Sequence, residues 1–166
     1  MMMKPGNVLI AMLCILALGG CSYKPLYGTT SDDRGVVGEL ASISIPEADS
    51  RLGQIIRNDL LSSMRPAGRE SQDRYRLDLK LSKSRSAVID KKQPNETRNS
   101  VNVAVDFTLL DGEKEVYKGK TFSQVSYDVV RQPFADTQAE NDATERVAHE
   151  LSADIRTRLA AYFATH

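Results

Sequence analysis

The middle of the chain, residues 75–127, constrains the fold most strongly, because apolar and polar side chains alternate there with the two-residue period of a β-strand. The apolar positions of two such runs are Tyr75, Leu77, Leu79 and Leu81, and then Val101, Val103, Val105, Phe107 and Leu109. Asp111 and Gly112 predict a tight hairpin turn, since both favour the positive φ angles that such turns require. A further strand is predicted over Val116–Tyr127, where Gly119 indicates a bulge or a close approach to the backbone.

A short strand and a helix are predicted before this region. Residues Leu40–Ile45 alternate in polarity until Pro46, which predicts a first strand. The helix is predicted to begin after Asp49 or Ser50, whose side chains can accept hydrogen bonds from the unpaired N–H groups of the first turn. Its apolar side chains recur at three- and four-residue intervals and would form one stripe: Leu52, Ile55, Ile56, Leu60 and Met64. Pro66 is expected to end it.

A long amphipathic helix is predicted after Pro133, with Asp136 as its cap. Its apolar stripe consists of Ala143, Val147, Leu151, Ile155, Leu159 and Phe163. The predicted order of elements is therefore β-α-β-β-β-α, which indicates an α+β fold. We expect a two-layer sandwich, in which two helices pack on one face of a four-stranded, largely antiparallel sheet. The other face of the sheet stays polar.

The N-terminal segment is typical of a bacterial secretory signal peptide. Lys4 precedes the uncharged apolar stretch Val8–Leu18, and the small residues Gly19 and Gly20 follow it. The apolar stretch is shorter than the about 20 residues that a membrane-spanning helix needs. An uncleaved N-terminal anchor helix is the alternative interpretation.

Cys21 is the predicted lipidation site, because Leu18-Gly19-Gly20-Cys21 resembles the lipobox of bacterial lipoprotein precursors. A diacylglycerol on its thiol and a fatty acyl chain such as palmitate on its amine would give the two or more chains that stable anchoring takes. A disulfide lacks a partner, since Cys14 would be removed with the signal peptide. Ser22 after the cysteine favours the outer membrane. We therefore predict three segments: a signal peptide over 1–20, a lipidated N-terminus and tether over 21–35, and one α+β domain over 36–166.

No catalytic site, metal site or further cofactor is predicted, so the chain is not expected to be an enzyme. The only histidines are His149 and His166, and neither has the thiol or imidazole neighbours of a metal site. No glycine-rich phosphate loop and no serine at a strand–turn–helix elbow occur. Lys and Arg together number 22, as do Asp and Glu, so no overall positive charge favours nucleic acid.

Basic side chains gather around the predicted hairpin and on the strand beside it: Lys80, Lys83, Arg85, Lys91, Lys92, Arg98, Lys118 and Lys120. Lysine binds phosphate groups as a point charge and arginine binds them as a fork. These eight residues are therefore candidates for contacting the phosphates of an anionic glycolipid. The alternative is an ordinary solvated sheet face, whose charges discourage pairing between sheet edges.

Three features together resemble the lipopolysaccharide-assembly lipoprotein family (LptE, also called RlpB), in its α-proteobacterial form. They are the lipobox running into CSYKPLYG, the predicted element order, and the ending FADTQAENDATERVAHELSADIRTRLAAYF. The resemblance implies a non-enzymatic lipoprotein of the outer membrane that faces the periplasm and the lumen of a large β-barrel. It would plug and help to assemble this lipopolysaccharide translocon, and so support insertion of lipopolysaccharide into the outer leaflet. Some family members bind lipopolysaccharide directly.

Two other functions stay open at this point. One is an auxiliary lipoprotein of another envelope lipid-transport complex. The other is a lipid-anchored periplasmic hydrolase, which would need a nucleophile and a base that the sequence does not single out.

Overall fold

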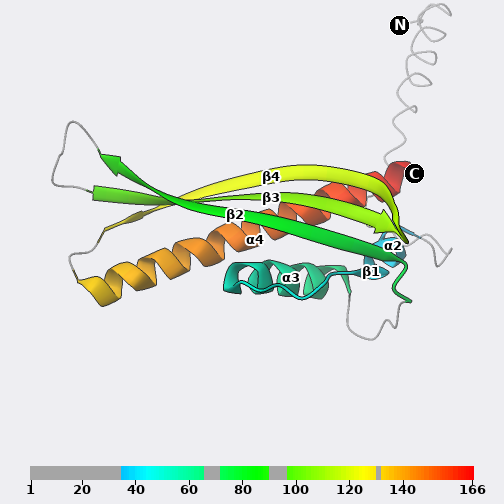
Figure 1. Ribbon diagram of the computed structural model, residues 1–166, viewed down its shortest axis with the longest axis horizontal. Helices are drawn as coiled ribbons and strands as arrows, with labels where there is room; N and C mark the ends of the chain where they lie inside the picture. The colour runs from blue at the N-terminus through cyan, green and yellow to red at the C-terminus, as the bar shows by residue number, and fades with distance from the viewer. Residues whose placement is uncertain (1–34, 66–71, 90–96, 130–131) are drawn as a thin grey trace, which may run out of the picture.

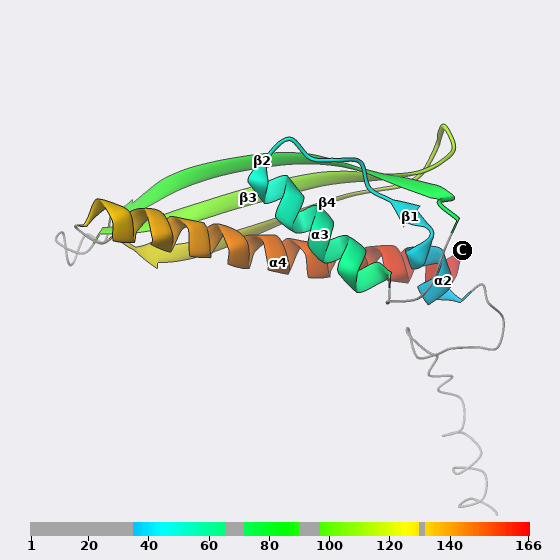
Figure 2. The same ribbon diagram turned by 90° about the horizontal axis from the view of Figure 1, so that it is seen from below.

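The computed structural model describes residues 35–65, 72–89, 97–129 and 132–166. The elements are α2 (Val36–Ala41), β1 (Ile43–Ser44), α3 (Arg51–Met64), β2 (Tyr75–Ile89), β3 (Thr97–Asp111), β4 (Lys114–Asp128) and α4 (Pro133–Thr165). The three helices lie on one face of the four-stranded sheet and leave its other face uncovered (Figures 1 and 2). The predicted two-layer α+β sandwich is confirmed, with a third, short helix added. The predicted signal peptide, tether and Cys21 lie outside the described residues.

The sheet has the strand order β1-β2-β3-β4. Strand β1 pairs with β2 in parallel through Ile43 and Tyr75, and α3 forms the connection between these two strands. Strands β2, β3 and β4 form an antiparallel meander. Gly112 has φ of 62° in the turn between β3 and β4, as the Asp-Gly pair predicts. The sheet is therefore largely antiparallel, with a single short parallel pair.

The strand predicted over Leu40–Ile45 is wrong in its first half. Residues Val36–Ala41 form α2, and only Ile43 and Ser44 pair with the sheet. The backbone N–H of Ser42 donates to the carbonyl of Gly38, and its hydroxyl donates to Glu39, so the helical turn is completed at Ser42. A helix buries Leu40 and Ala41 as well as a strand would, and an alternation of six residues is too short to distinguish the two.

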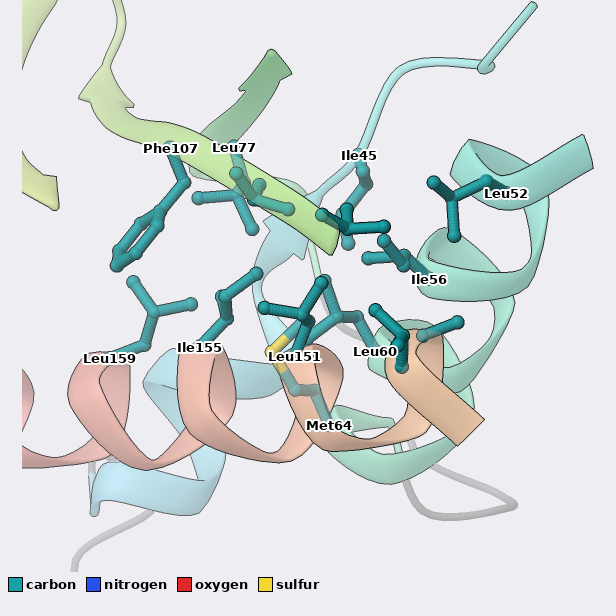
Figure 3. Close-up of a cluster of buried hydrophobic side chains, with 14 of the residues drawn as sticks. Ile45, Leu52, Ile56, Leu60, Met64, Leu77, Phe107, Leu151, Ile155 and Leu159 are labelled. Atoms are coloured by element: carbon teal, nitrogen blue, oxygen red, sulfur yellow. The ribbon is translucent and has the colours of Figure 1, made fainter. Parts of the chain in front are cut away.

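The two longer helices follow the predicted apolar stripes. Ser50 caps α3, since its hydroxyl accepts the backbone N–H of Gly53 at 3.1 Å. The predicted Asp136 cap on α4 is wrong: Gln132 is the N-cap without a side-chain bond, and Pro133 occupies the first turn, where its missing N–H costs nothing. Core side chains from both layers face one another in Figure 3: Leu77 and Phe107 from the sheet, Ile56 and Leu60 from α3, and Leu151, Ile155 and Leu159 from α4.

On β2 the apolar core ends at Leu81, whereas on β3 it continues to Val101. Helix α4 has 33 residues and runs along most of the sheet, whereas α3 has 14 residues and covers one half (Figure 2). In α4 the first buried residue is Ala143, and β2 is exposed at every position over 82–87. We call the part of the sheet beyond Leu81 of β2, with the facing parts of β3 and β4, the distal half, and the rest the proximal half.

Candidate functional site

The uncovered side of the sheet is the candidate functional surface, and we call it the open face. The side chains of Val101, Val103 and Val105 point to the helices and are buried. Because side chains alternate along a strand, the even-numbered residues over 78–84 of β2, 102–108 of β3 and 118–124 of β4 lie on the open face. The strand registers then align these residues in rows of three across the sheet. No helix of the described chain covers these rows (Figure 1).

The proximal half of the open face carries three of the predicted basic residues. One row consists of Lys80, Asp106 and Lys120, and Lys118 lies in the next row. The ammonium group of Lys120 lies 3.6 Å from the carboxylate of Asp106. We call Lys80, Lys118 and Lys120 the lysine cluster. Within the part of the chain that the structure describes, Lys80 and Lys118 have no ion-pair partner, so the cluster keeps positive charge that an anion could neutralise.

A hollow of about 360 Å³ lies beside two of these lysines. Its lining is Asp78, Leu79, Lys80, Asp106, Thr108 and Lys118. Two lysines and a threonine hydroxyl can donate to an anion there, whereas the two aspartates would repel one. The hollow is therefore suited to a phosphate group held at its lysine side and not to a deeply buried anion.

Lys83 and Arg85 lie on the opposite face, toward the helices. Lys83 Nζ lies 3.2 Å from Glu140 Oε1, and Arg85 Nη1 lies 3.0 Å from Glu140 Oε2, so both cations bind one carboxylate of α4. Lys83 also bonds the hydroxyl of Thr144. Hydrogen bonds with Tyr127 and Glu140 raise the pKa of Arg85 above its usual value. These two residues join the distal half of the sheet to α4 and are separate from the lysine cluster.

Glu140 shows the same coupling from its own side. Burial raises its pKa, but the hydrogen bonds and charges of Lys83 and Arg85 outweigh burial and hold the pKa below its ordinary value of 4.5. The carboxylate is therefore the ionised centre of a three-residue network between the two layers.

The remaining predicted basic residues do not join the lysine cluster. Arg98 lies at the distal end of β3, where its Nε is 2.8 Å from the carboxylate of Asp128. Lys91 and Lys92 lie outside the described residues. The structure thus divides the predicted set between two faces and two ends of the sheet.

The histidines contact neighbouring side chains. His149 on α4 places Nδ1 2.5 Å from Asp59 Oδ2 on α3, and Nε2 3.8 Å from Glu145 Oε1. His166 stacks on Tyr162 with ring centroids 4.5 Å apart. The described residues contain no group of three or more side chains that could hold a metal ion. His149 therefore ties the two long helices together.

The sequence interpretation missed two residues of these surfaces. Phe122 lies on the open face of β4 and is 76% exposed. The sequence could have indicated this position, because Phe122 is two residues from Lys120 and residues two apart on a strand share a face. Glu140 is 57 and 55 residues from its partners Lys83 and Arg85, so no local pattern could indicate these contacts.

Among the helices that the structure describes, none combines the length and the apolar composition needed to cross a bilayer.

A family model and several solved structures match this chain. The family model of LptE, described as lipopolysaccharide-assembly, matches residues 40–159. A protein from Caulobacter crescentus assigned as a lipoprotein has a crystal structure with 29% identity and a TM-score of 0.63, and the match covers 79% of this chain and 97% of that one. No curated protein matches the chain.

Two more distant crystal structures share the fold. A minor lipoprotein from Acinetobacter baumannii is 17% identical with a TM-score of 0.55, over 72% of this chain and 88% of that one. Rare lipoprotein B from Shewanella oneidensis is 16% identical with a TM-score of 0.52, over 74% of this chain and 95% of that one. The family model spans most of the chain, and the fold of this chain agrees with that of these lipoproteins. The chain belongs to the LptE family of lipopolysaccharide-assembly proteins.

Proposed function

We propose that this LptE-family chain is an outer-membrane lipoprotein that plugs the β-barrel lipopolysaccharide translocon and helps to assemble it. The observation that carries the proposal is the open face. Three 15-residue strands present a hydrophilic surface that no helix of the described chain covers. A surface of this kind suits the polar interior of a large barrel, where an apolar surface would not.

The mechanism is physical and needs no bond to be made or broken. The domain fills part of the lumen, and lipopolysaccharide passes between the open face and the barrel wall. The lysine cluster, with Lys80 and Lys118 beside the hollow, offers a transient site for the phosphates of the glycolipid. The three lysines are exposed, and Lys120 already forms an ion pair with Asp106. Phosphate binding there would therefore be weak enough to release the glycolipid.

The anchor is the lipid that we propose for Cys21. After cleavage before this residue, a diacylglycerol and a fatty acyl chain would hold the mature N-terminus in the inner leaflet of the outer membrane. The segment 21–35 would then act as the tether that lets the domain reach the barrel from the periplasmic side.

Co-purification from gently solubilised outer membranes tests the proposal. We expect the tagged full chain to recover a large outer-membrane barrel in stoichiometric amount. Recovery of the protein only as a free monomer would overturn the proposal. The proposal includes no catalytic step, so capture of the barrel partner is the measurement that decides it.

A photo-crosslinking residue tests the orientation in intact cells. At Gln124, which is exposed on the open face, it should form an adduct with the barrel. The matched position is Asn58, which is exposed on α3 in the other layer. Adducts from Asn58 alone would contradict placement of the open face against the barrel wall.

A further inference from the structure

The distal half of the open face differs in chemistry from the lysine cluster. Six residues in two adjacent rows form what we call the neutral platform: Ser82, Ala104 and Phe122 in one row, and Ser84, Asn102 and Gln124 in the next. None of the six is charged, although 27% of the residues in the whole chain are. The change occurs within one step of two residues along each strand, about 7 Å at the usual rise of a β-strand.

Phe122 presents its ring to solvent on this platform. Its side chain is 76% exposed, and its row neighbours across the sheet are the small residues Ala104 and Ser82. A single exposed apolar residue is common on protein surfaces. Here, however, the neighbours of Phe122 across the sheet are small, so its exposed ring can stack on a planar or ring-shaped ligand.

The polar members of the platform can donate and accept hydrogen bonds. Gln124, Ser82 and Ser84 are exposed, and their side chains have no hydrogen-bond partner among the described residues. The amide nitrogen of Asn102 donates to Ser86 Oγ at 3.0 Å, which leaves its carbonyl oxygen as an acceptor. Amides and hydroxyls together supply both donors and acceptors without charge.

We propose that the neutral platform binds sugar rings of lipopolysaccharide, with Phe122 as the stacking residue; the proposal rests on the proposed function. A sugar ring has C–H groups on its faces and hydroxyl groups around its rim. An exposed aromatic ring matches the faces, and neighbouring amides and hydroxyls match the rim. The adjacent lysine cluster matches phosphate groups. The two halves of the open face could therefore bind the sugar rings and the phosphates of one phosphorylated saccharide side by side.

The test uses the full mature lipoprotein in detergent micelles. The probe is the core oligosaccharide released from lipopolysaccharide by mild acid hydrolysis and then dephosphorylated, so that it has neither acyl chains nor phosphates. Saturation-transfer NMR reports which C–H groups of the sugar contact the protein, and a titration gives the affinity. We expect saturation transfer to ring C–H protons in the unmodified protein.

Phe122→Ala should weaken binding of this probe about fivefold to tenfold, the range expected for loss of one aromatic contact. The matched control is Phe134→Ala, because Phe134 is 80% exposed but lies in the first turn of α4. Both side chains are exposed, so neither variant should unfold the domain. Equal binding by the Phe122→Ala variant and the unmodified protein would overturn the proposal.

The second arm separates sugar binding from phosphate binding and from barrel binding. A Lys80→Ala, Lys118→Ala double variant should bind the dephosphorylated probe unchanged and the phosphorylated one more weakly. If Phe122→Ala lost the barrel but kept the probe, Phe122 would be a protein contact and the proposal would be wrong. The unmodified protein could instead bind the probe more tightly than the Phe122→Ala variant and yet capture no barrel. In that case only the proposed translocon function would fail.

Discussion

The ring of Phe107 on β3 lies directly against Gly119 on β4, its partner in the strand register. A Cβ atom at Gly119 would lie only 2.3 Å from Phe107 Cζ, which no packed structure allows without movement. Phe107 is fully buried, and its ring centroid is 5.9 Å from that of Tyr117. The absence of a side chain at Gly119 therefore makes the space that this core aromatic ring fills.

Gly119→Ala should lower the free energy of unfolding by about 1–3 kcal/mol, because the added methyl group overpacks the core and forces Phe107 to move. Urea denaturation followed by circular dichroism measures the change. Gly35→Ala is the control, since a Cβ at Gly35 meets nothing within 4 Å. Equal loss of stability in both variants would contradict this explanation.

Glu140→Gln should weaken the attachment of α4 to the distal half of the sheet. At pH 7 we expect a loss of about 0.5–1 kcal/mol, because Lys83 and Arg85 are partly exposed and solvent screens the network. The folded pKa of Glu140 lies below 4.5, so its stabilising contribution is present above that pH and is lost as the pH falls through the folded pKa.

The difference between the unmodified protein and the Glu140→Gln variant should therefore shrink below pH 4.5. Denaturation curves from pH 7 to pH 3 give this difference directly. Glu113→Gln in the β3–β4 turn serves as the matched carboxylate, because Glu113 is exposed and has no ion pair among the described residues. A difference that stays constant across this pH range would contradict the network.

The Lys80→Ala, Lys118→Ala double variant should reduce affinity for intact lipopolysaccharide about tenfold and make the remaining binding less sensitive to salt, since two phosphate contacts are removed. Equilibrium binding at two salt concentrations measures both effects. Lys114→Ala provides the control, because Lys114 is exposed at the start of β4 and does not line the hollow. If Lys114→Ala reduced affinity equally, the lysine cluster would not be the phosphate site.

Cys21→Ser should abolish incorporation of labelled palmitate and leave the precursor unprocessed, because serine has no thiol to accept the diacylglycerol. Metabolic labelling followed by gel electrophoresis shows both effects. Cys14→Ser is the internal control and should be processed and labelled as the unmodified chain is. Labelling of the Cys21→Ser variant would place the lipid elsewhere.

The sequence predicts the meander well because strand alternation continues for many residues and one face is buried. The same alternation also carried information on the basic residues, since Lys83 and Arg85 continue the series of Tyr75, Leu77 and Leu79 along one face. That Lys83 and Arg85 point toward the helices was therefore predictable. Their partner Glu140 was not, because it comes from a distant helix and its position depends on how α4 packs.

The beginning of the domain was harder to predict for a different reason. Six residues over Leu40–Ile45 fit either a strand or the end of a helix, and tertiary packing decides between them. The indication at Gly119 was sounder. The sequence indicated either a bulge or a close approach at Gly119. The close approach is confirmed, because the Phe107 ring lies against Gly119, whereas the shift in strand register lies at Leu109 and Leu110.

The position of α4 after the sheet in the chain has a consequence for folding during synthesis. Strands β2, β3 and β4 are made before α4, and this last helix covers much of the apolar inner face of the strands. Until that helix is complete, Val101, Val103 and Val105 lack their packing against α4, and their apolar side chains stay exposed beside the edge strand β4. We therefore expect the unfinished chain to be prone to aggregation until the part of α4 around Leu159 has been made.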